Sequence, residues 1–385
     1  MTVSFLLPTR DRPEYLSLAI ETVRAQEGND WEIVVSDNST KESSEGLIRD
    51  LGDDRIRYHR TDGSLPVTEN WNRALSLSTG DYVLMLGDDD GVLPGYLTWV
   101  AETVDLFDQP DAVYTGSRVF TYPSVDPDRP NGFLMSNTYA DFLGDEPALI
   151  TLEQGLAAVR RAMGFHLPFN FNMQVWLLSR RLIERLGHRG PVFQSPFPDY
   201  YASCAALLEG RRIVADPREP VVIGVTPKSY GFFHVNERES EGRAFLAADT
   251  DSPPQLPGTN INEGWLAAME AIEANYGRQT GLHVDRRRYR LVQAAAIYGR
   301  RRRGTASDTE YRSFAASLPV GERVVFAAAN AAAAVVRRAP ARRLWVPLAD
   351  RAQMRALAQF PDIAPDRDVG RYRDLLEVCA ATRIE

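Results

Sequence analysis

Three adjacent aspartates, Asp88, Asp89 and Asp90, follow the apolar segment 82–86 after a single glycine, Gly87. Because neighbouring carboxylates repel one another, a site that gathers them usually binds a cation. Hard ions such as Mg²⁺ and Mn²⁺ prefer oxygen ligands and commonly share them with substrate phosphates. The alternative is a solvated turn before the helix predicted from Pro94, where negative charge is also favoured. The sequence favours the metal site and leaves the turn open.

Polar residues follow two further predicted strands. Segment 3–7 runs into the sequence PTRDR at 8–12, and segment 31–36 ends at Asp37. Ligands of an open parallel sheet bind beyond the carboxyl ends of its strands. We therefore expect both segments to line the same site as the three aspartates, although Asp37 taken alone is better explained as a loop cap.

The elements that must position these residues alternate between strands and helices. Short apolar runs predict the strands, and apolar residues at helical spacing predict the helices between them. This alternation predicts an α/β fold with a mostly parallel sheet covered on both faces. Residues 121–150 are rich in Pro, Asp and Asn without periodicity and predict a long loop. The predicted strands are 3–7, 31–36, 55–59, 82–86, 112–115, 174–178, 212–215 and 221–225, and the predicted helices begin near 13, 67, 94, 152, 180 and 200.

Composition narrows the class of protein. The chain has 385 residues, with 44 Lys+Arg against 52 Asp+Glu and two cysteines. This length suffices for two or three domains, and two distant cysteines form neither a disulfide framework nor a cysteine metal site. The N-terminus lacks signal-peptide character, and the longest apolar stretch, 324–336, is too short to span a bilayer. We expect a cytoplasmic protein rather than a secreted or integral membrane protein.

Charge divides the chain into two parts. Residues 1–255 carry 23 Lys+Arg and 38 Asp+Glu, a balance of −15, whereas residues 256–385 carry 21 and 14, a balance of +7. A linker-like segment, 249–258, separates a predicted catalytic domain (1–248) from a helical, Arg-rich C-terminal region (259–385). These arginines suit peripheral contact with an anionic membrane or an acidic acceptor, and a solvated helical cap or homo-oligomer surface explains them as well. Nucleic acid is not an expected partner, because no binding motif accompanies the basic runs.

Several common ligand motifs are missing. The sequence has no GxxxxGK[ST] loop and no GxGxxG after a predicted strand, so it offers no Gly-rich backbone cradle for phosphate. It also lacks GxSxG, HExxH and CxxC. A nucleotide bound here therefore needs its diphosphate neutralised by a metal and by arginine side chains.

A series of motifs resembles the family 2 glycosyltransferases of the GT-A fold. In order, they are PTRDR at 8–12, SDNS at 36–39, NRAL at 72–75, GDYVLMLGDDD at 80–90 and LPG at 93–95. The resemblance covers residues 2–240. It implies an inverting enzyme that uses Mn²⁺ or Mg²⁺ and moves a sugar from a nucleotide-diphosphate donor, with a UDP-sugar expected, to an acceptor hydroxyl. The expected acceptor is a saccharide, a lipid-linked saccharide or another small molecule.

The resemblance implies roles for individual residues. Asp37 matches the aspartate that contacts the nucleotide base. Gly87 replaces the first aspartate of the family's Asp-x-Asp motif, so Asp89 keeps the position of the metal ligand, and Asp88 or Asp90 makes the ribose or supporting contact. The other matched residues line the nucleoside pocket (Pro8, Thr9 and Arg12) or lie near the donor diphosphate (Asn72 and Arg73).

An inverting transfer needs a base that takes the proton of the acceptor hydroxyl as it attacks the anomeric carbon. In the resembled family this base is a carboxylate that opens a helix, and Asp199 matches it, with Pro198 in place of the usual Glu. Asp199 is also suited to the role of a helix N-cap, and one residue can serve both roles. His234 matches a histidine that helps to hold the metal or diphosphate, and Lys228 is a candidate phosphate contact within a lid-like segment, 224–240.

Two other functions stay open. A sugar-phosphate nucleotidyltransferase has a related α/β fold, but the Gly-rich basic loop that such an enzyme needs after its first strand is missing here. A glycosyltransferase-like binding module without turnover is the second alternative, because Gly87 and Pro198 depart from the family pattern.

Overall fold

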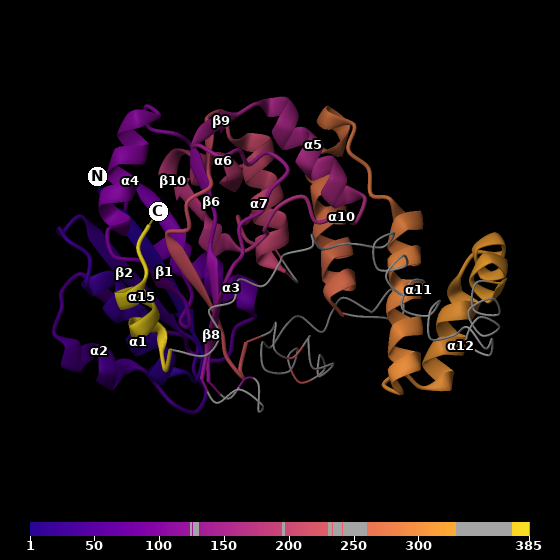
Figure 1. Ribbon diagram of the computed structural model, residues 1–385, viewed down its shortest axis with the longest axis horizontal. Coiled ribbons are helices and arrows are strands. Elements are labelled where there is room, and N and C mark those ends of the chain that lie inside the picture. The colour runs from indigo at the N-terminus through magenta and orange to yellow at the C-terminus, as the bar shows by residue number, and fades with distance from the viewer. Residues whose placement is uncertain are drawn as a thin grey trace.

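The computed structural model (Figure 1) describes residues 1–123, 125, 131–194, 197–229, 233, 241, 260–328 and 372–384. Within these residues, eight strands form the central sheet: β1 (Val3–Thr9), β2 (Trp31–Asp37), β3 (Ile56–Arg60), β4 (Tyr82–Met85), β6 (Ala112–Thr115), β9 (Ala148–Ile150), β10 (Trp176–Ser179) and β11 (Ile213–Asp216). Their order across the sheet is β3-β2-β1-β4-β10-β6-β11-β9. The first four of these run parallel, whereas β10 runs antiparallel to both of its neighbours.

The apolar strands form the core because the sheet is covered on both faces. β1, β2 and β4 are buried along their whole length, and Phe5, Leu6 and Val34 have no exposed surface. Strands buried on both faces read as nearly continuous apolar runs rather than as alternating patterns. The predicted α/β fold with a mostly parallel sheet is confirmed, and the antiparallel β9 and β10 make the sheet mixed.

Helices connect the strands largely where the apolar spacing predicts them. Pro13 occupies the first turn of its helix, where the missing N–H costs no hydrogen bond. The helix predicted from Pro94 begins instead at Tyr96, because Gly95 adopts a left-handed conformation (φ 88°) as its N-cap. The helices of this part of the chain are α1 (Pro13–Arg24), α2 (Glu45–Leu51), α3 (Val67–Leu77), α4 (Tyr96–Leu106), α5 (Leu152–Met163), the 3₁₀ turn η1 (Met173–Val175), α6 (Arg180–Gly187) and α7 (Pro198–Glu209).

A second, smaller sheet lies next to the aspartate motif. Its strands are β5 (Gly91–Val92), β7 (Arg118–Thr121), β8 (Phe133–Ser136) and β12 (Val221–Val225), in the order β5-β12-β7-β8. β5 follows Asp90 directly, and β12 leads into Thr226. The long loop predicted for residues 121–150 is therefore wrong in part, because β8 and β9 lie within it. Both are short strands that pair with partners from elsewhere in the chain.

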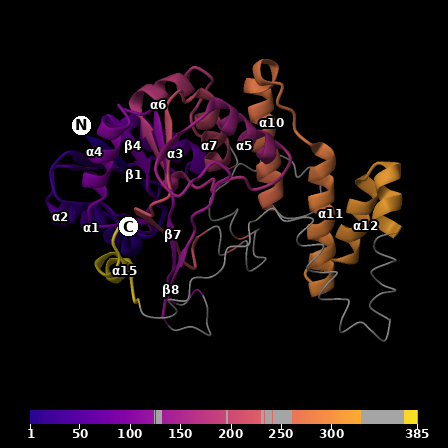
Figure 2. The ribbon, with the colours of Figure 1, turned by 45° about the horizontal axis from the view of Figure 1, so that its top comes forward.

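The helical C-terminal region is confirmed. It comprises α10 (Asn260–Thr280), α11 (Arg286–Arg303), α12 (Asp308–Ser317) and α15 (Leu375–Ala381). Figures 1 and 2 show α11 and α12 on the side away from the central sheet, with α10 between them and α7. The last helix, α15, returns to the N-terminal part and packs on α1 and β5.

The first and last of these helices extend the core of the N-terminal part. On α10, Trp265 is buried and donates its indole N–H to the carbonyl of Ala162 at 3.0 Å. On α15, Leu375 and Val378 join an apolar cluster that includes Leu93. The domain boundary predicted at 248–259 lies outside the described residues and stays a prediction. Over the same described residues, no helix is both long enough and apolar enough to cross a membrane.

Candidate active site

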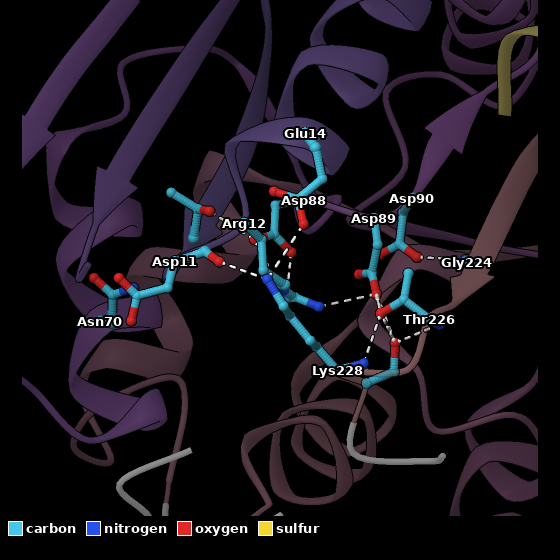
Figure 3. Close-up of polar contacts among 12 residues, drawn as sticks. Asp11, Arg12, Glu14, Asn70, Asp88, Asp89, Asp90, Gly224, Thr226 and Lys228 are labelled. Atoms are coloured by element: carbon cyan, nitrogen blue, oxygen red, sulfur yellow. Dashed lines mark hydrogen bonds and ion pairs between the residues drawn. The ribbon is translucent and has the colours of Figure 1, made fainter. Parts of the chain in front are cut away.

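A charge cluster centred on Arg12 lies at the carboxyl edge of the central sheet (Figure 3). Arg12 directly precedes α1, and its side chain is 14% exposed. Its Nε donates to Oδ2 of Asp88 at 3.0 Å, its Nη2 pairs with Oδ1 of the same carboxylate, and its Nη1 donates to Oδ2 of Asp89 at 3.0 Å. Thr9, the last residue of β1, donates its hydroxyl to Asp88 at 2.6 Å. The two motifs that the strand-end argument placed together therefore meet.

The pairing in this cluster opposes the effect of burial. Burial lowers the pKa of Arg12, but the carboxylates of Asp88 and Asp89 raise it above its ordinary value. Burial also raises the pKa of Asp88 to about 6, an effect that the Arg12 guanidinium opposes. The ion pairs with Arg12 therefore offset part of the cost of burying the Asp88 carboxylate.

Asp89 receives further donors from the segment that follows β12. Its Oδ2 accepts hydrogen bonds from the hydroxyls of Ser229 at 2.6 Å and Thr226 at 3.4 Å. Its Oδ1 has no hydrogen-bond partner within the part of the chain that the structure describes, and the residue keeps 8% of its surface exposed. One carboxylate oxygen of the cluster is thus left for a ligand.

Both carboxylate oxygens of Asp90 accept hydrogen bonds from neighbouring elements of the fold. Its Oδ1 accepts the backbone N–H of Gly224 at 2.8 Å, and its Oδ2 accepts Nε2 of Gln174 at 2.6 Å. Burial and the neighbouring Asp89 raise the pKa of Asp90 well above its ordinary value. A Cβ at position 224 would collide with the carbonyl oxygen of Asp89, so this close approach of β12 requires glycine. Asp90 therefore joins β12 and η1 behind the cluster.

Asp37 is fully buried and shapes the loop after β2. Its Oδ1 accepts the N–H of Ser39 at 2.8 Å, and its Oδ2 accepts the N–H of Ser44 at 2.8 Å and the hydroxyl of Tyr58 at 2.7 Å. Both oxygens thus perform the loop-capping role that the sequence allowed. The predicted contact of Asp37 with a nucleotide base stays a prediction.

Asp11 fastens the same loop from the other side. It adopts a left-handed conformation (φ 53°), and its Oδ1 accepts three successive backbone N–H groups, those of Thr40 at 3.0 Å, Lys41 at 2.7 Å and Glu42 at 3.0 Å. Its carbonyl accepts Nζ of Lys228 at 2.9 Å. Lys228, a candidate phosphate contact, therefore ties the segment after β12 to the segment before α1.

The two residues predicted near the diphosphate lie on α3. Asn72 donates to the carbonyl of Phe193 at 2.8 Å and accepts its N–H at 3.1 Å, which connects α3 to the segment before α7. Arg73 donates to the carbonyl of Arg60 at 3.1 Å. Its Nη1 is buried and has no hydrogen-bond partner among the described residues. A diphosphate contact for either residue stays a prediction.

Phe197 is the N-cap of α7, so the predicted N-cap role of Asp199 is wrong, but Asp199 lies in the first turn of this helix as the sequence predicted. It is the second residue of the helix after Pro198, and its Oδ1 accepts the N–H of Tyr200 at 3.1 Å. Burial raises its pKa to about 7, although hydrogen bonds from the backbone oppose this effect. Over the described residues, no arginine or lysine pairs with its carboxylate, and the side chain remains partly exposed. A carboxylate with these properties is suited to exchange a proton near neutral pH.

The short turn η1 connects this carboxylate to the Arg12 cluster. Gln174 of η1 donates to Asp90, and η1 packs on both β4 and α7. Phe171, just before η1, stacks on Tyr200 with ring centroids 4.4 Å apart, and Tyr200 also contacts Trp265 of α10. The N-terminus of α7 and the end of β4 are therefore positioned by one shared element.

The donor set fits a hard cation that takes few protein ligands. Asp89 offers one open carboxylate oxygen, whereas Asp88 and Asp90 are engaged with protein donors. Across the described ranges, no group of three or more His, Cys, Asp or Glu side chains gathers as a metal site. His234, the other predicted ligand, lies outside the described residues. Mg²⁺ commonly binds through one or two carboxylates and completes its shell with phosphate oxygens and water, which matches a single open oxygen.

Comparison with known proteins identifies the domain that carries this cluster. The family model described as Glycosyl transferase family 2 matches residues 4–163, which include β1, β4 and the aspartate motif. The chain carries a family 2 glycosyltransferase domain. The predicted family is therefore confirmed, and the GT-A resemblance agrees with the mixed, mostly parallel sheet.

Several curated relatives of this glycosyltransferase domain are sugar transferases by name. The chain is 32% identical over 99 residues to the GalNAc(5)-diNAcBac-PP-undecaprenol beta-1,3-glucosyltransferase of Campylobacter jejuni, which covers 25% of this chain and 32% of the relative. It is 34% identical over 97 residues to the abequosyltransferase RfbV of Salmonella typhimurium, a match that covers 24% of this chain and 29% of the relative. The chain thus spans about a third of the length of these relatives. Among solved structures it is similar to S. aureus TarS 1-349 in complex with UDP-GlcNAc, at 14% identity and a TM-score of 0.47 over 81% of this chain and 90% of that one.

Sequence reasoning missed several residues of the glycosyltransferase cluster. Gln174, Thr226 and Ser229 reach the aspartates from segments more than 80 residues further along the chain. Of these, Thr226 and Ser229 fall within segment 224–240, whose composition predicted a lid. The sequence therefore indicated that this segment belongs to the site, but it did not indicate that Thr226 and Ser229 contact Asp89. The pairing of Arg12 with both Asp88 and Asp89 was also missed, because a basic residue in a strand-end motif does not reveal which carboxylate it contacts.

Proposed function

We propose that the chain is an inverting glycosyltransferase that moves a sugar from a nucleotide-diphosphate donor to an acceptor hydroxyl. A UDP-sugar is the expected donor, and Mn²⁺ or Mg²⁺ is the expected cofactor. The observation that carries the proposal is the single hydrogen-bonded cluster of Thr9, Arg12, Asp88 and Asp89 at the carboxyl edge of a family 2 domain. That edge is where open α/β sheets bind their ligands.

Asp199 is the proposed base of this reaction. Its partly exposed carboxylate takes the proton from the acceptor hydroxyl as the oxygen attacks the anomeric carbon from the face opposite the diphosphate, so the configuration inverts. Arg12 supplies positive charge beside the leaving diphosphate, and Ser229 and Thr226 add hydroxyl donors at the same place. A divalent cation held by Asp89 would neutralise further charge on the diphosphate as the bond to the sugar breaks.

The pH dependence of transfer follows from the pKa of Asp199. A base acts in its deprotonated form, and the pKa of Asp199 is raised to about 7 by burial. We therefore expect kcat/KM to rise about tenfold per pH unit below pH 7 and to level off above it. A pH–rate profile with the acceptor kept well below its KM measures this limb. A profile that stays flat through pH 7 would contradict the assignment.

Donor binding tests the proposal before an acceptor is known. Thermal unfolding is followed with UDP-, dTDP- and GDP-sugars, each with and without Mn²⁺. A ligand present at 100 times its Kd stabilises the folded state by about 2.7 kcal/mol, so at least one donor is expected to raise Tm by several degrees. No shift with any nucleotide sugar, from protein whose melting is cooperative, would count against a donor site.

The acceptor side rests on the names of the relatives and on the C-terminal helices. One relative is named for a saccharide linked to PP-undecaprenol, which supports a saccharide or lipid-linked saccharide as acceptor. Peripheral contact with an anionic membrane stays a prediction. On α11, Arg286 and Arg290 are paired with acidic side chains, whereas Leu291 is 41% exposed. Val320, in the helical residues that follow α12, is 76% exposed. Exposed apolar side chains next to arginines are the combination that such a contact needs.

A further inference from the structure

The carboxylate pair at the end of β4 already has a cation, and that cation is part of the chain. All three nitrogens of the Arg12 guanidinium face a carboxylate: Nε and Nη2 face Asp88, and Nη1 faces Asp89. Two-pronged contact of this kind is the strong form of an arginine–carboxylate interaction. Among the described residues, the ion pairs of Asp88 and Asp89 are all made with Arg12.

This arrangement conflicts with a tightly bound metal in the absence of donor. Asp89 contacts Arg12 through Oδ2, while its Oδ1 accepts no hydrogen bond from the residues that the structure describes. A divalent cation on this carboxylate would therefore lie within a few ångströms of a buried guanidinium, where like charges repel strongly because little water screens them. Arg12 also fixes Asp88, whose pKa would otherwise rise further with burial.

We propose that Arg12 is an internal counter-ion that competes with a divalent cation for Asp89 until a donor diphosphate binds. The diphosphate relieves the competition, because its oxygens accept hydrogen bonds from arginine and also complete the shell of the cation. Metal and donor then bind cooperatively, and the protein without nucleotide binds metal weakly. The donor part of this inference rests on the proposed function, whereas the competition at Asp89 does not.

The competition is tested by Mn²⁺ binding without nucleotide, measured from the electron paramagnetic resonance signal of free Mn²⁺. The Arg12→Gln variant is expected to bind Mn²⁺ at least tenfold more tightly than the wild type, which corresponds to about 1.4 kcal/mol. Arg12→Lys keeps the charge and is expected to stay as weak as the wild type. Adding Asp89→Asn to Arg12→Gln is expected to remove the gain.

A matched control is Arg55→Gln, because Arg55 also makes a two-pronged contact with an aspartate, Asp53, but at the start of β3, far from the carboxyl edge. It is expected to leave Mn²⁺ binding unchanged. Equal or weaker Mn²⁺ binding by folded Arg12→Gln, or a gain that survives Asp89→Asn, overturns the proposal.

A second measurement uses the wild type alone and applies even if Arg12→Gln fails to fold. Mn²⁺ affinity is compared with and without UDP, and the competition predicts at least tenfold tighter binding with UDP. Tight Mn²⁺ binding that UDP does not change contradicts the proposal. If Arg12→Gln gains Mn²⁺ but no nucleotide sugar is turned over, the proposed function fails while the competition stands. If a nucleotide sugar is turned over but Arg12→Gln does not bind Mn²⁺ more tightly, the competition fails while the proposed function stands.

Discussion

Replacing Asp199 by asparagine is expected to reduce sugar transfer by about 10²- to 10⁴-fold, the usual contribution of a general base. Asparagine has nearly the same shape and still accepts the N–H of Tyr200, so α7 keeps its start. Donor binding, which we propose to involve the Arg12 cluster, is expected to stay close to that of the wild type. The measurement is kcat for transfer together with the Kd of the donor.

A purely structural role of Asp199 in the first turn of α7 predicts a different outcome. An acidic side chain near a helix N-terminus contributes about 0.3–1 kcal/mol to stability, and its loss does not act selectively on kcat. Asp308→Asn is a matched control, because Asp308 also lies in the first turn of a helix, α12, and is exposed. Normal transfer by Asp199→Asn would exclude Asp199 as the base.

Replacing Asp89 by asparagine is expected to reduce donor turnover by about 10²- to 10³-fold, the typical cost of removing one preorganised electrostatic contact. The change removes the negative charge that Arg12, Ser229 and Thr226 surround, and it replaces one of the two carboxylate oxygens by an NH₂ group, which is not a cation ligand. Both donor affinity and kcat are expected to fall. Steady-state kinetics of nucleoside diphosphate release measure this effect.

Asp90→Asn is the matched control for this second prediction. Asp90 is adjacent in sequence, but both of its oxygens are used within the protein and its pKa is raised well above the ordinary value. An asparagine keeps an oxygen that accepts the N–H of Gly224, and the amide of Gln174 can turn to match its NH₂ group. A much smaller loss than for Asp89→Asn is therefore expected, and equal losses would mean that the motif acts only through its packing.

The sequence predicted the parts of the fold that local patterns determine. The buried strands β1, β2 and β4 are continuous apolar runs, and α5 begins with Thr151 and Gln154, which form a capping box. The strands β8 and β9 were missed because they are only four and three residues long: β8 pairs with the preceding strand β7 across a long connection, and β9 pairs with the distant β11. No local pattern encodes such pairing.

For the site, the sequence predicted which strand ends come together, but it did not predict which side chains contact one another. The rule that ligands bind beyond the carboxyl ends of strands placed Thr9 and Asp88 together, and the structure joins them by a hydrogen bond of 2.6 Å. The choice of partner for each charged side chain was not predictable, because it depends on tertiary contacts. Arg12 donates hydrogen bonds to Asp88 and Asp89. Lys228 donates one to the carbonyl of Asp11. Both oxygens of Asp37 cap the loop after β2, so its hydrogen bonds within the protein account for the loop-cap prediction, and its contact with a nucleotide base stays a prediction.

The most direct test of the account is the release of nucleoside diphosphate from a panel of UDP-, dTDP- and GDP-sugars by the wild-type protein with Mn²⁺. We expect release from at least one donor, with the reaction strongly reduced in Asp89→Asn. Release of pyrophosphate from a nucleoside triphosphate and a sugar phosphate would instead indicate a nucleotidyltransferase. Donor binding without any turnover would indicate a binding module. Equal release by the wild type and Asp89→Asn would contradict the central role of the Arg12–Asp88–Asp89 cluster.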